Sequence, residues 1–149
     1  MTATGHAIIG TIIAAKFGNP YLAVPLAIAS HILADMTPHW DTATNAHKKG
    51  KQRVFYETLV DIAAGFLLSY ILIVFLFPQT NLLYAFFIII VSQSLDWLMA
   101  PYYFFNWKTP IFVWAYKFQK TFDNSMDSPW GIINQIAILL FIIFLAVIL

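Results

Sequence analysis

The sequence contains no cysteine and few charged residues. Without cysteine, the chain of 149 residues can form no disulfide and can offer no thiolate to a metal ion. Any bound metal would therefore be held by histidine, aspartate or glutamate. Lysine, arginine, aspartate and glutamate make up only 10% of the residues, whereas 60% are hydrophobic. Soluble globular domains do not show this balance, so the composition predicts an integral membrane protein.

Long polar segments are also absent. The chain, residues 1–149, has room for one domain of four or five short membrane helices, but none for a separate soluble catalytic domain. Any chemistry must therefore take place among the helices. The formal net charge of +1 indicates no anionic partner, and no nucleic-acid-binding motif is present. The N-terminal segment lacks a basic start and a cleavage motif, so we expect a retained helix rather than a signal peptide.

Five apolar segments predict membrane helices. Residues 54–77 and 81–105 are each long enough to cross about 30 Å of hydrocarbon at 1.5 Å per residue, and residues 131–149 nearly reach that length. In the first forty residues, a Gly-Asn-Pro break separates apolar runs at 3–15 and 21–40, which predicts a helical hairpin. Small residues recur along both runs and would allow close packing. We therefore predict an all-α polytopic membrane helix bundle with about five membrane helices.

Basic residues suggest how this bundle is oriented. The loop 47–53 carries Lys48, Lys49, Lys51 and Arg53, and the positive-inside rule places such a loop in the cytoplasm. The turn at 78–81 then lies outside, and residues 106–129 return to the inside. Residues 111–122 mix aromatic side chains with lysines over a stretch too short to span, which predicts a short interfacial helix. Aromatic side chains at the same face fit a membrane-anchoring belt: Trp97, Tyr102, Tyr103, Trp107, Trp114 and Trp130.

Seven ionisable residues lie in the predicted membrane helices or at their ends: His6, His31, Asp35, His39, Glu57, Asp61 and Asp96. A carboxylate at membrane depth costs about 2.5–3.5 kcal/mol on insertion scales, so such groups usually face protein or water. With the orientation above, all seven fall in one layer near the cytoplasmic face. This layer predicts a shared site.

The spacing of these residues supports a shared site. Side chains four residues apart lie on one helix face, and three helices carry such polar pairs: His31 with Asp35, Glu57 with Asp61, and Ser92 with Asp96. Pro38 should end the second helix and leave His39 beside a break. Irregular backbone at membrane depth is tolerated only where it is buried in protein or lines a wet cavity. The end of the second helix is therefore a candidate site.

Imidazole and carboxylate groups suit divalent Zn, Mn, Fe or Mg, and this ligand set suits one or two such ions. Its three or four carboxylates carry nearly the negative charge that two divalent cations would neutralise. A metal held there would acidify a water molecule and polarise a carbonyl or phosphoryl oxygen. We predict metal ligands at His31, Asp35 and His39, with His6, Asp61 and Asp96 as further ligands or their supports, and Glu57 or Asp41 as general base. Structural roles stay open for His6 as an interfacial residue, for Asp61 and Asp96 in ion pairs, and for Glu57 as a solvated side chain.

The stretch SHILADMTPHWD, from Ser30 to Asp41, together with the earlier Gly5 and His6, resembles the family of membrane-bound metal-dependent hydrolases. Members of that family are small inner-membrane proteins of bacteria and archaea. The resemblance covers the first sixty residues, and carries over residue by residue to His6, His31, Asp35, Pro38 and His39, with Asp61 and Asp96 as later acids. It implies a metal-dependent hydrolytic site and a location in a bacterial or archaeal cytoplasmic membrane.

The resemblance also implies a further histidine or acidic motif toward the C-terminus. Residues 122–131, FDNSMDSPWG, contain no histidine but offer Asp123 and Asp127, either of which could complete the site. Alternatively, Ser128 caps the last helix and Pro129 occupies its first position.

Three functions fit these patterns. The first is a metal-dependent hydrolase that acts on a lipid or lipid-linked ester or phosphoester at the cytoplasmic leaflet. The second is an ion- or proton-coupled transporter, which would need polar residues continuing to the outer face. The outer halves of the third and fourth predicted helices are almost without such residues. The third is a scaffold in which a metal only locks the helices together.

Overall fold

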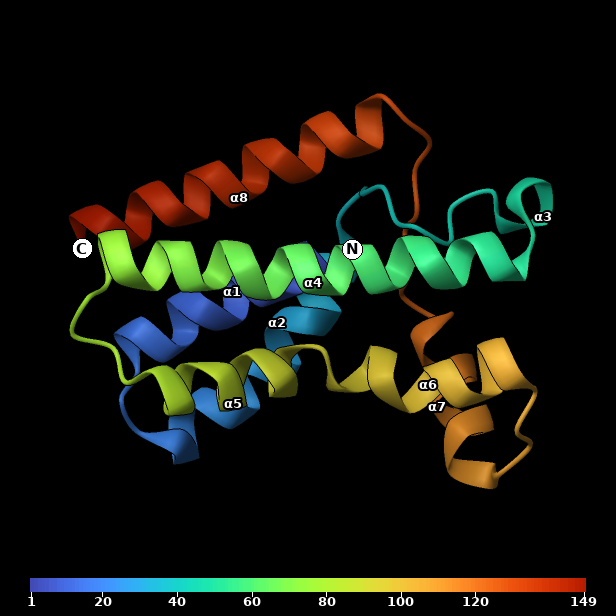
Figure 1. Ribbon diagram of the computed structural model, residues 1–149, viewed down its shortest axis with the longest axis horizontal. Helices are drawn as coiled ribbons and strands as arrows, with labels where there is room; N and C mark the ends of the chain where they lie inside the picture. The colour runs from blue at the N-terminus through green and yellow to red at the C-terminus, as the bar shows by residue number, and fades with distance from the viewer.

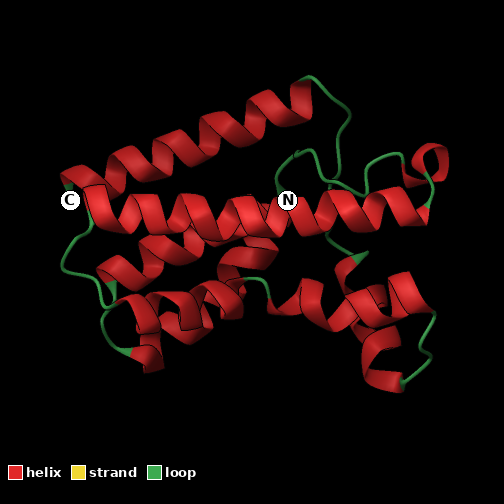
Figure 2. Cartoon of the chain, viewed as in Figure 1, coloured by secondary structure: helices red, strands yellow, loops and turns green.

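The computed structural model describes residues 1–149 as helices joined by loops (Figures 1 and 2). The helices are α1 (Ala3–Lys16), α2 (Pro20–Met36), α3 (Ala46–Lys49), α4 (Lys51–Leu76), α5 (Leu82–Ser92), α6 (Ser94–Phe105), α7 (Pro110–Gln119) and α8 (Trp130–Ile148). There are no strands, and the one β-type pairing is an isolated bridge between His39 and Ser125. The all-α prediction is confirmed.

Local sequence signals explain where α2 begins and ends. The side chain of Asn19 accepts a hydrogen bond from the backbone N–H of Tyr21 at 2.9 Å, and Pro20 occupies the first turn, where no amide partner is lost. The helix ends at Met36, because Pro38 restricts the residue before it to an extended conformation. The predicted break before His39 is confirmed.

Helix α1 lies at the centre of the bundle and contacts α2, α4, α5 and α8. All residues from Gly5 to Ala14 are buried, as expected for a helix that is enclosed on every side. A Cβ on Gly10 would lie only 2.6 Å from Oγ of Ser92 in α5, and a Cβ on Gly65 in α4 would lie 3.1 Å from that of Ala7. Small residues therefore pack α1 against α4 and α5 as well as against α2.

Two helices, α4 and α8, are long and apolar enough to cross a membrane. Helices α5 and α6 meet that criterion only together, as a pair bent by 51°. Helices α1 and α2, with 14 and 17 residues, are shorter than the roughly 20 residues of a full span. The structure thus has two or three candidate spans rather than the five membrane helices expected, because the breaks at Asn19 and Pro38 keep α1 and α2 short.

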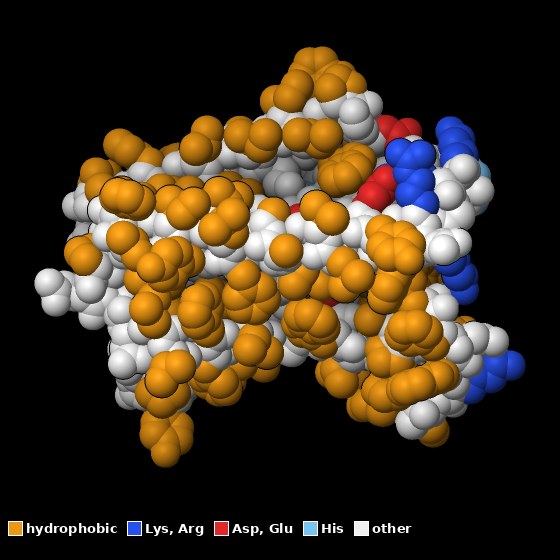
Figure 3. Space-filling view, in the orientation of Figure 1, with side chains coloured by type: hydrophobic (Ala, Val, Ile, Leu, Met, Phe, Trp, Pro, Cys, Tyr) orange, Lys and Arg blue, Asp and Glu red, His pale blue; other side chains and the backbone are white.

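The surface separates apolar from basic side chains. Hydrophobic side chains cover most of the face shown in Figure 3, and the Lys and Arg side chains visible there lie at the end that carries α3, the start of α4 and the connection between α6 and α7. Lys16 lies at the other end, beside Phe77. The segment 111–122, predicted as a short helix, forms α7 over Pro110–Gln119, and α7 packs on α6. This distribution is the one expected of a membrane protein with one charged end.

Candidate metal centre

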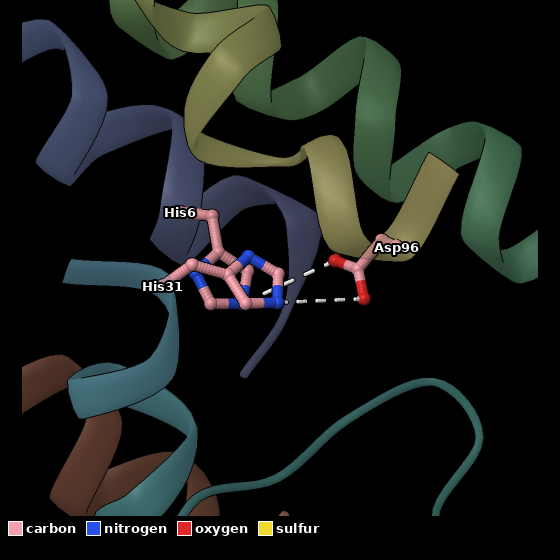
Figure 4. Close-up of side chains that lie close together, drawn as sticks. All are labelled: His6, His31 and Asp96. Atoms are coloured by element: carbon pink, nitrogen blue, oxygen red, sulfur yellow. Dashed lines mark ion pairs between the residues drawn. The ribbon is translucent and has the colours of Figure 1, made fainter. Parts of the chain in front are cut away.

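His6, His31 and Asp96 come together from three different helices (Figure 4). His6 lies in α1, His31 in α2 and Asp96 in the first turn of α6, just after the bend. One ligand-type atom from each residue lies within 4.8 Å of the others. The two imidazole rings stack with centroids 3.9 Å apart and planes 12° from parallel. Two imidazolium cations in such contact would repel each other, so at least one ring is neutral, the form that binds metals.

Asp35 lies beside both rings, one turn after His31 on α2. Its Oδ1 is 3.1 Å from Nε2 of His6, and its Oδ2 is 3.3 Å from Nε2 of His31. The side chains of Asp35 and both histidines are each only 1% exposed. The predicted pair of His31 and Asp35 therefore points into the same buried cluster as His6 and Asp96.

Backbone carbonyl groups fix the orientation of two histidines. Nδ1 of His31 lies 2.8 Å from the carbonyl oxygen of Ser92, and Nδ1 of His39 lies 2.8 Å from that of Thr37. A carbonyl oxygen can only accept a hydrogen bond, so Nδ1 is the protonated nitrogen in each ring. In a neutral ring, Nε2 then carries the free lone pair. This arrangement is typical of metal-binding histidines, whose second nitrogen donates to a carbonyl or carboxylate.

The Nε2 atoms of His6, His31 and His39 are all buried and have no hydrogen-bond partner. Buried polar atoms without partners are rare, and each costs about 1–3 kcal/mol. A divalent cation held by His6 and His31 would take up the lone pairs of both rings, because imidazole nitrogen and carboxylate oxygen suit Zn, Mn and Fe. The residues present therefore fit the metal that the sequence predicts.

Gln119 and the amino group of Met1 also contact the carboxylates. Nε2 of Gln119, at the end of α7, donates to Oδ1 of Asp96 at 2.7 Å and to Oδ2 of Asp35 at 3.4 Å. The Met1 amino group donates to Oδ1 of Asp35. The sequence reasoning missed both groups, although Gln119 lies four residues before Asp123 and repeats the spacing of the other polar pairs.

Asp123 joins the cluster from the loop before α8. Its Oδ1 is 3.4 Å from Nε2 of His39, and its Oδ2 accepts a hydrogen bond from Nζ of Lys120 at 2.6 Å. Burial alone would raise the pKa of Asp123, but its interactions with His39 and Lys120 outweigh burial and lower that pKa to about 2. Burial alone would likewise lower the pKa of Lys120, yet pairing with Asp123 raises it. The carboxylate of Asp123 is therefore ionised at neutral pH.

The other acidic residue of that segment, Asp127, bonds to the side chain of Asn45 instead. The expected cap at Ser128 does not form, because α8 begins at Trp130 and Pro129 occupies the capping position without a side-chain hydrogen bond. Of the two acids offered by residues 122–131, only Asp123 contacts a cluster histidine.

Three predicted site residues have other partners. Asp61 accepts hydrogen bonds from the backbone N–H groups of Ala3 at 2.6 Å and Thr4 at 3.3 Å, at the start of α1. The carboxylate of Glu57 forms salt bridges to two cations of the basic loop and the start of α4, each at 2.8 Å. Oδ1 of Asp41 accepts a hydrogen bond from the N–H of Ala43 at 2.5 Å and stabilises a turn. None of the three contacts the cluster histidines.

A cavity of about 370 Å³ lies beside the cluster. Its walls come from α4, α6, the start of α1 and the loop after α2, and most of them are apolar, including Phe55 and Phe104. Asp96 belongs both to these walls and to the cluster, and Asp41 and Asp61 are the other carboxylates that line the cavity. The candidate metal centre therefore adjoins an apolar space large enough for a small ligand.

No family model, curated protein or solved structure matches the chain. The function is therefore inferred from the geometry and chemistry of the site.

Proposed function

We propose that this chain is an integral membrane, metal-dependent hydrolase that cleaves a lipid or lipid-linked ester or phosphoester. The observation that carries the proposal is that the buried Nε2 atoms of three histidines have no hydrogen-bond partner and lie beside an apolar cavity. Asp96 belongs both to the ligand group and to the wall of that cavity. The resemblance of residues 30–41 to membrane-bound metal-dependent hydrolases supports the same activity.

His6, His31 and Asp96 would hold the ion, with Asp35 close to both imidazoles. A divalent cation in this position supplies Lewis-acid polarisation of a carbonyl or phosphoryl group and acidifies water. The other residues keep the ligands in place. The Ser92 carbonyl orients His31, and Gln119 donates to both carboxylates. Such supporting contacts typically change metal affinity or activity by 10- to 100-fold.

The cavity supports a lipid-like substrate. Its apolar walls between α4 and α6 suit an acyl chain, and a metal held by Asp96, which lines the cavity, would lie next to the ester group. We assign the general base to Asp41, which lines this cavity, rather than to Glu57, which does not. Glu57 is held by Lys49 and Arg53, and a carboxylate paired with two cations is a poor proton acceptor.

The membrane location follows from the apolar surfaces of α4, α8 and the bent pair of α5 and α6. In this proposal the shorter helices α1 and α2 also lie within the membrane, either enclosed by the spanning helices or beside them. Together with α4, the bent pair of α5 and α6, and α8, they form the five membrane segments expected from the sequence. The loop 47–53 lies in the cytoplasm of a bacterial or archaeal cell, at the charged end of the molecule. The substrate would then enter from the cytoplasmic leaflet.

The activity can be tested with protein purified in detergent and loaded with Zn or Mn. We expect hydrolysis of a long-chain lipid ester or phosphoester in mixed micelles, and slower cleavage of a short water-soluble ester. His31→Ala should abolish the activity, whereas Asp41→Asn should lower it by about 100-fold or more. His47→Ala is the matched control, because His47 lies in the basic helix α3 and has no contact with the cluster. Folded, metal-loaded protein that cleaves none of these substrates would contradict the proposal.

A second candidate function is structural. Gln119 already connects the carboxylates of Asp35 and Asp96 across α2, α6 and α7, and the Met1 amino group donates to Asp35. In a scaffold of this kind, any metal would only lock the helices together. His31→Ala would then lower the midpoint of thermal unfolding, and the wild-type protein would show no hydrolysis of any ester tested.

A further inference from the structure

His39 and Asp123 form a second pair of metal-ligand groups next to the first. The side chain of His39 is completely buried, and its Nδ1 donates to the carbonyl oxygen of Thr37. Its Nε2 has no hydrogen-bond partner and lies 3.4 Å from Oδ1 of Asp123. The lone pair of a buried imidazole therefore points at a carboxylate that the first ligand group does not use.

Asp35 lies between the two groups. Its Oδ1 is 3.1 Å from Nε2 of His6 and 4.0 Å from Nε2 of His39, and its Oδ2 is 3.3 Å from Nε2 of His31. The Asp35 carboxylate thus faces the imidazoles of His6 and His31 in the first group and that of His39 in the second. The Met1 amino group also contacts Oδ1, so a positive charge is already placed at this shared oxygen.

Backbone contacts hold the segments of the second pair together. The backbone N–H of His39 donates to the carbonyl oxygen of Asn124 at 3.3 Å. The backbone N–H of Asn124 in turn donates to the backbone carbonyl oxygen of Asp35 at 2.9 Å. A Cβ on Gly131 would lie 2.8 Å from the backbone nitrogen of Trp40, so the start of α8 packs directly on the His39 segment. The position of His39 beside Asp123 is therefore built by the fold, not by flexible side chains on the surface.

We propose that His39, Asp123 and Asp35 bind a second divalent cation, so that the centre is dinuclear with Asp35 as the bridging carboxylate. This inference rests on the proposed function in one respect, namely that His6, His31 and Asp96 bind the first ion. One imidazole and two carboxylates suit Zn, Mn or Fe. Two ions bridged by a carboxylate commonly lie about 3.5–4 Å apart and together clamp the oxygens of a phosphoester or ester.

The test uses the full chain in detergent, stripped with a chelator and then titrated with Mn²⁺. We expect wild-type protein to bind two equivalents and to give the exchange-broadened electron paramagnetic resonance spectrum of a coupled Mn pair. His39→Ala and Asp123→Asn should each bind one equivalent and show the six-line spectrum of an isolated ion. Asp127→Asn, in the same loop but bonded to Asn45, is the control and should keep two. Size-exclusion profiles and thermal unfolding would confirm that each variant is folded.

The outcomes separate the two proposals. If wild-type protein binds one ion, lost in His31→Ala but kept in His39→Ala, the second position is disproved and the first stands. Two equivalents retained in folded His39→Ala also overturn the second position. If folded wild-type protein binds no Mn²⁺, both proposals fail.

Discussion

Asp61 lies in α4, but its carboxylate accepts hydrogen bonds from the first backbone N–H groups of α1. Thr4 also donates from its hydroxyl group to the carbonyl oxygen of Asp61 at 2.9 Å. The first N–H groups of a helix have no partner within the helix, and the helix dipole favours a negative charge there. Asp61 thus acts as a cap supplied by a neighbouring helix.

Replacing Asp61 with alanine should therefore lower stability without removing the metal. Loss of a helix cap costs about 1–2 kcal/mol, so we expect a lower midpoint of thermal unfolding for Asp61→Ala in detergent. Metal content, measured by elemental analysis on the same samples, should equal that of the wild type. Loss of the metal at unchanged stability would show instead that Asp61 is a ligand.

The identity of the cluster residues followed from the sequence better than their roles did. His6, His31, Asp35, His39 and Asp96 stood out because ionisable groups are rare in apolar helices, and the structure brings them together. Spacing along a helix does not reveal which side chain from another helix lies opposite. For that reason the sequence suggests Asp61 as a ligand, whereas the structure places its carboxylate at the start of α1. The sequence also gives no sign that Gln119 contacts the cluster carboxylates.

At the scale of helices, the contact between α1 and α5 positions the cluster. Ser92 donates from its hydroxyl group to the carbonyl oxygen of His6 at 2.9 Å, and its own carbonyl oxygen accepts from His31. Ser92 is the last residue of α5, where the chain bends before α6. The bend therefore leaves this carbonyl free to accept a bond from the imidazole rather than from the next turn of helix.

Gly10 permits this contact, so Gly10→Ala should disturb it. The added Cβ would lie 2.6 Å from Oγ of Ser92 and 3.1 Å from Cα of Ile89, and overpacking of this kind costs about 1–3 kcal/mol. We expect a lower unfolding midpoint and weaker metal binding, since His31 would lose its fixed orientation.

Gly18→Ala provides the matched control, because no atom lies within 4 Å of the position of its added Cβ. Its stability should be unchanged or slightly higher. If both alanine variants behave alike in unfolding and in metal titration, the close packing of α1 on α5 does not position the centre.

The positions of most helices along the chain can be predicted from the sequence, but the angle between α5 and α6 cannot. Polar and proline breaks place α2, α4, α7 and α8 close to their expected ranges. The segment 81–105 was predicted as one span, but it divides at Gln93 into α5 and α6. Neither glycine nor proline marks that division, and Pro101 lies inside α6 without ending it. The bend coincides with the contacts of Ser92 to His6 and His31, which hydrophobicity does not report.

At the scale of the whole molecule, the basic end and the turn between α4 and α5 should lie on opposite sides of the membrane. The chain has no cysteine, so single cysteines can report orientation without background. We expect Gln52→Cys, an exposed position within the basic loop, to be shielded from a membrane-impermeant maleimide in intact cells and labelled after permeabilisation. Gln79→Cys, also exposed, should be labelled in intact cells. The reverse labelling pattern would contradict a cytoplasmic basic loop.

The metal-to-protein ratio of the purified protein shows whether the buried histidines bind a metal ion. His31→Ala removes a ligand, whereas His47→Ala removes a histidine of α3 that has no part in the cluster. We predict at least one equivalent of Zn, Mn or Fe in the wild-type protein and in His47→Ala, and its loss from folded His31→Ala. Folded wild-type protein that contains no metal and cannot be reloaded, or His31→Ala that keeps the full amount, would contradict the account.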